Sequence, residues 1–552
     1  MVGIYGSICA TAENRLTGAR RMAEKLTHDG SNENITFAGR NWSCGVVAPK
    51  HGSRVIKCRG KGVAVIFGVP VLRGEALLNF EDSIKLLADD LENSISDIQR
   101  HLKNFDGCFA LAVIDPSEEK LLLVSDPSGG VPIYYNEPNL TWASEPKALS
   151  TLDAVSPARL KDFVNHGYVR PPETYFHDVR QLPQRCAMIW DLNRLTVSTQ
   201  QVYERSMRPL KVRADPAEAC LEFSRLTTQA IRKRLVASGL DRVDVTLSGG
   251  LDSRLLAVEG NKNWPVRALS YGQRWSPELT LASNVANQLK VEHLVVHVEQ
   301  SNWLVGRDKA IWMTDGMMDM MHTHIWHLSP LLRSDRAILD GLFGDVVLGR
   351  SRITLDPEAD EHDNRLLRMS RFTFFGPRLE MNRSIVLTPL IDLDLIAFVD
   401  SLPEEMTSDG KLYRDACGTL YGAPFTEIAW HKTGRPPSPY ERNGIAKAIQ
   451  RTLKRTAQIS GWFGTPLLSR HETMDYFRWM KREPFRTYFL QLMYGKSALL
   501  KEYIDVPPEQ LLFTRLPAPN RVLQISRLLT LEAWLRQTQA GKFLTWEQML
   551  DS

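Results

Sequence analysis

The pattern of apolar and polar residues divides the chain near residue 205. Before that point, short β-rich runs bounded by Asp, Gly, Asn and Pro predict strands over 63–72, 108–115, 120–126, 186–192 and 195–203. Among them, residues 81–105 have the apolar spacing of an amphipathic helix. The first part is therefore predicted to consist mostly of strands, with short helices between them.

Beyond residue 205, strand and helix patterns alternate. They predict a long helix over 216–239, followed by further elements at 243–247, 266–272, 276–289 and 293–299. Strand–helix–strand alternation favours a parallel α/β sheet with right-handed crossovers. After residue 300 the pattern is mostly helical, and no motif stands out near the C-terminal end. We therefore predict three segments, which are 1–205, 206–435 and a helical extension over 436–552.

Composition limits the classes of protein that fit this pattern. A chain of 552 residues, 43% hydrophobic and 24% charged, suits a globular protein of about two to four domains. A net charge of +4 is too small to indicate a nucleic-acid partner. No apolar run could span a bilayer, residues 1–10 lack signal-peptide features, and the seven cysteines include no CxxC pair. We therefore expect a cytoplasmic protein with no nucleic-acid and no membrane partner.

The segment SGGLDS, residues 248–253, directly follows the predicted strand at 243–247. A glycine pair lets the backbone turn tightly, and a helix that begins there directs free N–H groups at the same point, which suits phosphate. Ser248 and Ser253 add hydroxyl donors, whereas Asp252 would repel phosphate unless it holds a divalent metal. A plain strand–helix turn with capping residues is the alternative interpretation.

A second segment, AILDGLFGDVVLG (337–349), also runs from an apolar strand into a glycine-rich loop with an acid, Asp345. Loops at the carboxyl ends of parallel strands converge on one crevice. Asp252 and Asp345 are therefore predicted to share a magnesium ion. Taken alone, this second loop could be only a turn.

These motifs together resemble a known family. SGGLDS is similar to the pyrophosphate loop of the ATP-pyrophosphatases, and residues 1–440 resemble, piece by piece, the asparagine synthetase superfamily. The segments that carry the resemblance are FDGCFALAVIDPSEEKLLLVSDPSGGVPIYY (105–135), WASEPKAL (142–149), PLIDLDLIAFVDSLP (389–403), KLYRDACGTL (411–420) and IAWHKTGR (428–435). The resemblance implies an N-terminal α+β sandwich of the Ntn-hydrolase type, related to class II glutaminases. An α/β synthetase domain with a parallel sheet, like the adenine nucleotide α-hydrolases, would follow it.

The resemblance also implies a reaction that uses ATP and Mg²⁺. ATP adenylates a carboxylate and releases pyrophosphate, and an amine then displaces AMP to form an amide. The residues implied to contact the nucleotide are Leu247, Ser248, Gly249, Gly250, Leu251, Asp252, Ser253, Ser270, Gly272 and Gly344, with Asp252 and Asp345 at the metal. Lys411 resembles the family lysine that reaches the ATP phosphates, and Lys432 the one beside the acyl-adenylate. For each lysine the alternative is a solvated surface charge.

The chain departs from asparagine synthetases at three places. Val2 stands where the glutaminase has its nucleophilic cysteine, and FGVPV (67–71) where the family shows Asn-Gly-Glu. SIVLT (384–388) is apolar where the family binds the substrate aspartate. We therefore expect an inactive glutaminase-like domain and a product other than asparagine.

Two branches of the superfamily carry an inactive glutaminase domain and form amides within one molecule. These are the β-lactam and carbapenam synthetases and the lasso peptide macrolactam cyclases. The β-lactam branch deprotonates the attacking nitrogen with a Tyr–Glu pair, whose Tyr position falls near His324 here, with Glu380 as a candidate acidic partner. His324 is thus predicted to be a general base with a pKa near neutrality, and a histidine packed in the core is the alternative.

We favour the lasso-cyclase-like interpretation because the apolar acceptor region, the Arg- and aromatic-rich extension and the length suit a large substrate. It implies a peptide or small carboxylate substrate, a leader-binding protein and a leader protease as partners. The alternatives are an asparagine synthetase-like or β-lactam synthetase-like ligase and a nucleotide-binding pseudoenzyme that serves as a scaffold. A tRNA-modifying pyrophosphatase is disfavoured by the glutaminase-like N-terminal part and the absence of a cysteine pair.

Overall fold

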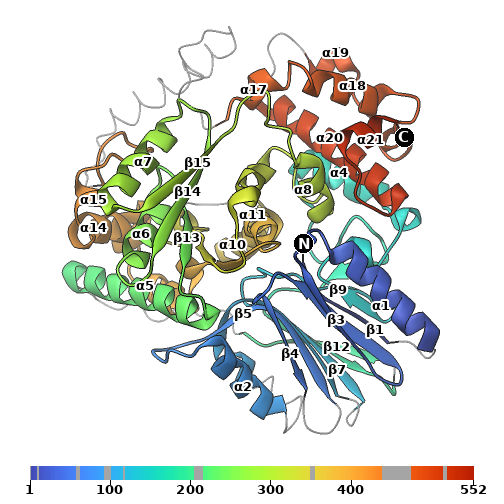
Figure 1. The fold of residues 1–552 in the computed structure, drawn as a ribbon, viewed down its shortest axis with the longest axis horizontal. Helices are drawn as coiled ribbons and strands as arrows, with labels where there is room; N and C mark the ends of the chain where they lie inside the picture. The colour runs from blue at the N-terminus through green and yellow to red at the C-terminus, as the bar shows by residue number, and fades with distance from the viewer. Residues whose placement is uncertain are drawn as a thin grey trace.

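The computed structural model describes residues 2–8, 12–57, 62–91, 101–115, 119–194, 196–203, 215–348, 355–437, 474–513 and 519–551. Figure 1 shows two β regions, an N-terminal one in blue and cyan and a separate green sheet formed by the middle of the chain. The C-terminal helices, in red, lie near helices of both parts. Within the described ranges, no helix combines the length and apolar character needed to cross a membrane.

Two antiparallel sheets form the N-terminal region, with orders β10-β8-β9-β1-β3-β2 and β12-β11-β7-β6-β5-β4. Their strands are β1 (Gly3–Ile8), β2 (Glu33–Ala38), β3 (Trp42–Ala48), β4 (Ser53–Lys57), β5 (Val63–Leu72), β6 (Phe105–Asp115), β7 (Lys120–Ser125), β8 (Tyr134–Asn136), β9 (Thr141–Ala143), β10 (Arg180–Gln181), β11 (Cys186–Asp191) and β12 (Thr196–Gln201). β1 and β3 pack on β5, and α1 (Ala12–Leu26) packs on the first sheet. The result is the sandwich arrangement expected from the sequence, although its relation to the Ntn hydrolases stays a prediction.

The long apolar runs in this region form strands that are buried on both faces. β5 packs on the first sheet and also against α2 (Phe80–Leu91) and α5 (Pro216–Ser238), so its residues are nearly all buried. This double covering explains why residues 63–72 read as a continuous apolar run and not as an alternating one. The helix expected over 81–105 is α2 in its first half, and residues 92–100 lie outside the described residues.

The middle of the chain forms a parallel sheet with the order β15-β14-β13-β16-β17. Its elements are β13 (Val243–Thr246), α6 (Leu251–Gly260), β14 (Val266–Gly272), α7 (Pro277–Leu289), β15 (Glu292–His297), β16 (Ala337–Leu339) and β17 (Ile385–Leu387). All four neighbouring pairs are parallel, as the strand–helix alternation predicted. β13 and β16 are adjacent, so the loops that follow them leave the same edge of the sheet.

The remaining elements are mostly short helices. Before and within the second region they are η2 (Pro146–Ala148), η3 (Leu152–Ala154), α4 (Pro157–His166), α8 (Arg307–Met313), η4 (His322–Leu331), α9 (Gly344–Val347), α10 (Glu361–Arg368), η5 (Met369–Thr373), α11 (Phe375–Glu380), η6 (Pro389–Ile391), α12 (Leu393–Ser401), α13 (Glu404–Thr407), η7 (Ser408–Gly410), α14 (Lys411–Leu420) and α15 (Ala423–Thr426). Near the C-terminus they are α17 (Tyr476–Trp479), α18 (Phe485–Tyr494), η9 (Leu500–Glu502), α19 (Glu509–Leu512), α20 (Pro519–Ala540) and α21 (Trp546–Asp551).

The C-terminal helices share a hydrophobic core with the N-terminal region. Trp534 of α20 is fully buried, and its ring lies 4.7 Å from that of Tyr175 and 5.6 Å from that of Phe176. Tyr175 in turn donates a hydrogen bond to the carbonyl of Gly316 at 2.9 Å. The extension therefore packs against residues 154–179 as well as against residues of the second region such as Ile311 and Met317.

Buried charges tie the two regions together. Arg234 of α5 donates to Asp106 of β6 at 2.7 Å and to Asp392 at 2.5 Å, and all three side chains are almost completely buried. Asp392 also caps α12 and pairs with Lys233 at 3.0 Å. Burial alone would raise the pKa of Asp392, but Arg234 and Lys233 hold it well below its usual range. This network connects the sandwich, α5 and the start of α12.

Candidate active site

The SGGLDS segment forms the turn between β13 and α6. Gly250 is the N-cap of α6, and the helix begins at Leu251, which is buried. The Ser248 backbone N–H donates to Ser253 Oγ at 3.0 Å, the two hydroxyls lie 3.1 Å apart, and the Gly250 N–H donates to Ser248 Oγ at 3.1 Å. The loop is therefore held in a compact turn, with the first turn of α6 directly behind it.

Close packing explains the small residues of this loop. A Cβ at Gly249 would lie 3.1 Å from Leu281 Cδ1 and 3.2 Å from His431 Cβ. The neighbours must therefore give way for any larger side chain. Leu247, at the base of the loop, donates its backbone N–H to Leu269 of β14 at 2.8 Å.

The loop after β16 lies directly against SGGLDS. A Cβ at Gly344 would come within 2.5 Å of Asp252 Cγ, and one at Gly341 within 3.0 Å of the Ser253 backbone nitrogen. The structure thus brings the two glycine-rich loops into contact, because β13 and β16 are neighbours in the sheet. The side chain of Asp345 lies outside the described residues, so its predicted role beside Asp252 stays a prediction.

Tyr413 is a neighbour of Asp252 that the sequence analysis missed. Its hydroxyl donates to Asp252 Oδ1 at 2.8 Å from the buried face of α14. Burial and the adjacent carboxylate raise the pKa of Tyr413 well above its usual value, so it remains a neutral donor. Lys411 starts the same helix but is exposed, and it occupies a different face because it is two residues away.

Arg254 is a second residue that the sequence did not single out. This fully buried side chain of α6 donates to the carbonyls of Pro424, Ile428 and Ala429, each at 2.9 Å. It thereby fixes the segment IAWHKTGR against the loop, where the His431 N–H donates to the Gly249 carbonyl at 3.3 Å. Lys432 follows His431, is exposed, and has its Nζ 5.5 Å from the Trp430 ring centroid.

Ser270 and Gly272 lie at the carboxyl end of β14, beside the loop. The buried Ser270 hydroxyl donates to the Leu247 carbonyl at 2.6 Å and lies 2.8 Å from His293 Nε2. That hydroxyl therefore stabilises the base of the loop and already has two protein partners. Gly272 has a positive φ of 149°, and its carbonyl accepts the Val298 N–H at 2.9 Å.

His324 differs from the expectation of a base with a near-neutral pKa. It lies on η4, its ring centroid is 5.4 Å from that of Tyr271, and its Nδ1 is 3.1 Å from the Met321 carbonyl. Burial, followed by the positive charge of Arg307 and by His322, lowers its pKa to about 3. His324 is therefore neutral at physiological pH and too weakly basic for the predicted role. The reason is that its ring is buried and lies near the positive charge of Arg307.

Glu380 pairs with another carboxyl group, that of Asp340. Glu380 is 1% exposed, and neither of its oxygens accepts a hydrogen bond from a donor group among the described residues. Burial, and next the nearby Asp340, raise its pKa well above the usual value, and burial raises that of Asp340 to about 6. Two carboxyl groups buried near each other do not readily ionise together, because the negative charge of one disfavours that of the other.

The carboxyl pair borders the nucleotide loop. Asp340 follows β16 and immediately precedes Gly341, which packs on Asp252 and Ser253. Tyr271 lies close enough to Tyr476, Glu380 and Asp340 for each to raise its pKa further, after the larger effect of burial. The carboxyl ends of β14 and β16 therefore bring a buried group of side chains together beside the SGGLDS loop, in which the rings of Tyr271 and His324 are in contact and the carboxyl groups of Asp340 and Glu380 lie nearby.

The N-terminal positions that would hold a glutaminase site are apolar. Val2 is 1% exposed, and Phe67, Val69 and Val71 are buried in β5, paired with β6. The stretch that replaces the aspartate site forms β17, whose three residues are all buried. In both places the described side chains contribute packing and offer no polar group to a substrate.

The loop offers one carboxylate, that of Asp252, as a ligand for a magnesium ion. The described residues contain no group of three or more His, Cys, Asp or Glu side chains arranged to hold a metal. Mg²⁺, however, is usually bound by one or two carboxylates together with substrate phosphates and water. Asp252 supplies one carboxylate at the loop, so the residues fit a metal that arrives with its nucleotide.

Comparison with known proteins identifies two domains. Residues 96–204 match the family model of a glutamine amidotransferase domain, and residues 222–373 match that of asparagine synthase. The chain is 27% identical to asparagine synthetase [glutamine-hydrolyzing] of Cricetulus griseus over 237 residues, which is 39% of each protein. It is 24% identical to putative asparagine synthetase [glutamine-hydrolyzing] 1 of Methanocaldococcus jannaschii over 328 residues, 56% of this chain and 58% of the relative.

These matches cover only part of the relatives, between about two-fifths and three-fifths of their length. Among solved structures, glutamine phosphoribosylpyrophosphate amidotransferase from B. subtilis shares 11% sequence identity at a TM-score of 0.25, with 78% of this chain covered and 99% of the other. A likeness at that TM-score supports no conclusion. The matched synthase segment contains the SGGLDS loop and Asp340, and it ends before Glu380.

Proposed function

We propose that this chain, which carries the two domains of the asparagine synthetase superfamily, is an ATP-dependent, AMP-forming ligase that joins a carboxylate to an amine. One observation carries the proposal. The SGGLDS turn, with Asp252 and the start of α6, lies in contact with a second glycine-rich loop at the carboxyl edge of a parallel sheet. Backbone N–H groups and a carboxylate at such an edge suit the phosphates of ATP.

The residues of the loop have distinct tasks in this reaction. A substrate carboxylate oxygen attacks the α-phosphorus of ATP, the bond to pyrophosphate breaks, and the leaving charge is bound by N–H groups of the loop and of the first turn of α6. Asp252 would hold Mg²⁺, which neutralises phosphate charge when bound. Tyr413 orients Asp252, and the exposed cations Lys411 and Lys432 remain candidates for phosphate and acyl-adenylate contacts.

The second half of the reaction needs a proton acceptor. The amine nitrogen attacks the acyl carbon, AMP leaves, and the nitrogen must lose a proton. In our proposal the Asp340–Glu380 pair accepts it, because a carboxyl pair with raised pKa values binds a proton more readily than an ordinary carboxylate. Glu380 was a candidate from the sequence, and we propose Asp340 as its partner in place of His324.

The domain matched to glutamine amidotransferases is proposed to lack glutaminase activity. Val2 offers no nucleophile, and the segment 67–71 is an apolar strand. Ammonia released from glutamine is therefore not the proposed amine. The buried strand β17 likewise disfavours free aspartate as the carboxylate donor.

For the substrate, we propose a peptide that is closed into a macrolactam, as in lasso peptide cyclases. Tyr476 of α17, in the C-terminal extension, lies near Tyr271 at the carboxyl end of β14, so the extension contributes an aromatic side chain to the surroundings of the loop, which supports a substrate with an apolar part. An Asp or Glu side chain would be adenylated and the N-terminal amine of the same peptide would attack it. A leader-binding protein and a leader protease would then act as partners.

The test is to incubate the purified protein with ATP, Mg²⁺ and a leader-cleaved precursor peptide encoded nearby, and to follow AMP and the peptide mass. We expect AMP together with the loss of one water from the peptide. AMP formed only with ammonia and aspartate would overturn the peptide proposal in favour of asparagine synthesis, and AMP formed only with a small β-amino acid precursor would favour a β-lactam synthetase. Nucleotide binding without AMP under every condition would overturn the ligase proposal and favour a scaffold.

A further inference from the structure

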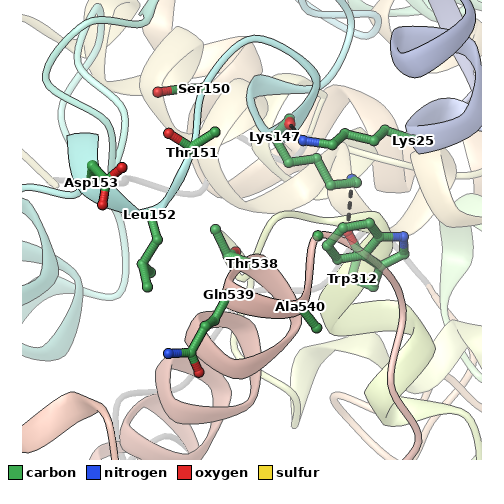
Figure 2. Close-up of a pocket in the computed structure, with 11 residues that line it drawn as sticks. Lys25, Lys147, Ser150, Thr151, Leu152, Asp153, Trp312, Thr538, Gln539 and Ala540 are labelled. Atoms are coloured by element: carbon green, nitrogen blue, oxygen red, sulfur yellow. Dashed lines mark hydrogen bonds between the residues drawn. The ribbon is translucent and has the colours of Figure 1, made fainter.

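A cavity of about 380 Å³ lies where three parts of the chain meet. Figure 2 shows its walls, which are Lys25 near the end of α1, Lys147, residues 150–153, Trp312 of α8 and residues 538–541 at the end of α20. None of these residues belongs to the nucleotide loop or to the carboxyl pair. Small-molecule sites commonly have volumes of about 300–1,000 Å³.

Lys25 brings a positive charge to this cavity without a carboxylate partner. Its Nζ donates to the Lys147 carbonyl at 2.7 Å, and among the described residues no Asp or Glu forms an ion pair with it. Burial lowers the pKa of Lys25, and the positive charge of Lys147 lowers it further. Asp315 raises this pKa, and Arg21 lowers it. An ammonium group that has lost part of its hydration and lacks a counter-ion favours an anion beside it.

Lys147, the other cation of the cavity, is already neutralised. Its Nζ forms ion pairs with Glu145 and with Asp315, and it donates to the Trp312 carbonyl at 2.8 Å. The same Nζ lies 4.8 Å from the centroid of the Trp312 ring. Lys147 therefore joins the N-terminal region to α8, and the charge left for a ligand is that of Lys25.

The other walls combine apolar surface with polar side chains, among them the exposed carboxylate of Asp153 and a hydroxyl without a partner in the described part of the chain, that of Thr538. Leu152 and Trp312 line the cavity, and Trp312 lies opposite Thr538 and Leu152 in Figure 2. Thr538 Oγ1 is buried and has no hydrogen-bond partner among the described residues. A turn of this side chain towards the cavity would give the hydroxyl a partner, since an unpaired buried hydroxyl is unfavourable.

We propose that this cavity binds a small organic carboxylate with a flat apolar body, whose charge pairs with Lys25 and whose body lies against Trp312 and Leu152. The site does not depend on the ligase proposal. Its occupant would contact the N-terminal region, α8 and the C-terminal extension at once. A ligand that binds only where these parts are assembled stabilises the folded chain.

Benzoate is the probe that tests this site, and benzamide is its neutral counterpart of the same shape. We expect isothermal titration of the full chain to show one saturable benzoate site, and thermal unfolding to shift upward with benzoate but not with benzamide. Lys25→Met is expected to weaken benzoate binding about ten- to a hundredfold, as for the loss of a charged hydrogen bond. Lys161→Met, an exposed lysine of α4 outside the cavity, is expected to leave binding unchanged.

A second variant fills the cavity with a larger side chain. It distinguishes a direct contact between Lys25 and the ligand from an indirect effect of Lys25→Met on the structure. Ala540 is exposed at the end of α20 and lines the cavity, so Ala540→Trp is expected to abolish benzoate binding while the protein remains folded. Binding that survives both Lys25→Met and Ala540→Trp would overturn the proposal. Equal binding of benzamide, or no benzoate binding by the folded wild-type chain, would overturn it as well.

Discussion

The N-terminal sandwich and the parallel sheet differ in what their strands carry. In the parallel sheet, strand ends lead into Ser248, Asp252 and Asp340, which have polar or charged side chains in two loops that pack against each other. In the sandwich, Val2 and the segment 67–71 are apolar and buried. The sandwich is stabilised by faces that pack on each other, and this packing needs no nucleophile. Such packing would be kept if the proposed loss of glutaminase chemistry is right, whereas the proposed phosphate-binding role of SGGLDS depends on its glycines and acid.

The largest effect is expected when the buried ion pairs that join the two regions are removed. Arg234→Met leaves Asp106 and Asp392 buried without their shared cation, which costs about 3–5 kcal/mol in comparable buried pairs. We expect a large fall in the free energy of unfolding, measured by chemical denaturation. Arg232→Met, an exposed arginine of the same helix, is the control and is expected to change little. Similar losses for both variants would show that the network is not what joins the regions.

The second variant removes the chemistry of the parallel sheet and keeps its fold. Asp252→Asn retains the shape of the side chain but removes the charge proposed to hold Mg²⁺. We expect AMP formation to fall about 10²–10³-fold, the range seen when one transition-state contact is lost. Asp335→Asn, an exposed acid in the same region, serves as the control. Wild-type rates of AMP release from Asp252→Asn would contradict the assignment of the loop.

The third variant tests the carboxyl pair through pH. Burial raises the pKa of Glu380, so this group binds more protons in the folded chain than in the unfolded chain. The free energy of unfolding therefore falls as pH rises above about 4, the pKa of glutamate in the unfolded chain. We expect wild type to lose stability relative to Glu380→Gln progressively as pH rises above about 4, with the smallest difference at acidic pH. Chemical denaturation across this range measures it.

The same variant has a catalytic readout. Glu380→Gln is expected to slow amide formation more than adenylation, because only the second step loses a proton acceptor. Pyrophosphate exchange and product formation, measured separately, distinguish the steps. If both steps slowed equally, or if the pH dependence of stability were unchanged, Glu380 would have only a packing role.

The smallest expected effect is in the sandwich. Val2→Cys restores a thiol at the position of the missing nucleophile and is nearly isosteric, so we expect a stability change within about 1.5 kcal/mol. We also expect no glutamate release from glutamine, because the segment 67–71 offers no polar side chain to bind it. Glutamate production above the wild-type level would mean that the domain kept a glutamine pocket.

Local patterns predicted the architecture well because their causes are local. The parallel pairing of the second sheet and the loop after β13 follow from apolar periodicity and from glycines at strand ends, whereas the order of the strands was not predicted. The site was predicted less completely. Tyr413 follows Lys411 by two residues, and only the packing of α14 on α6 shows that the tyrosine, not the lysine, contacts Asp252. Arg254 was missed because its three carbonyl partners lie about 170 residues away in the chain.

His324 shows the limit of reasoning from residue type. A histidine has a near-neutral pKa in water, and only the burial of its ring and the nearby Arg307 reveal that it titrates at about 3. In the same way, nothing in the sequence pairs Asp340 with Glu380, since they lie on different elements and meet only in the folded chain.

The sequence by itself determined apolar strands such as β5, β6 and β13, which loops are rich in glycine, and that position 2 is a valine and 67–71 contains no polar side chain. Periodicity and backbone freedom act between residues that are close in the chain, so a single chain displays them. Only the tertiary structure decided which acid lies beside which base, which lysine lacks a counter-ion, and which charges join the regions. Those properties depend on distance and burial, and both are set by elements that are remote in sequence.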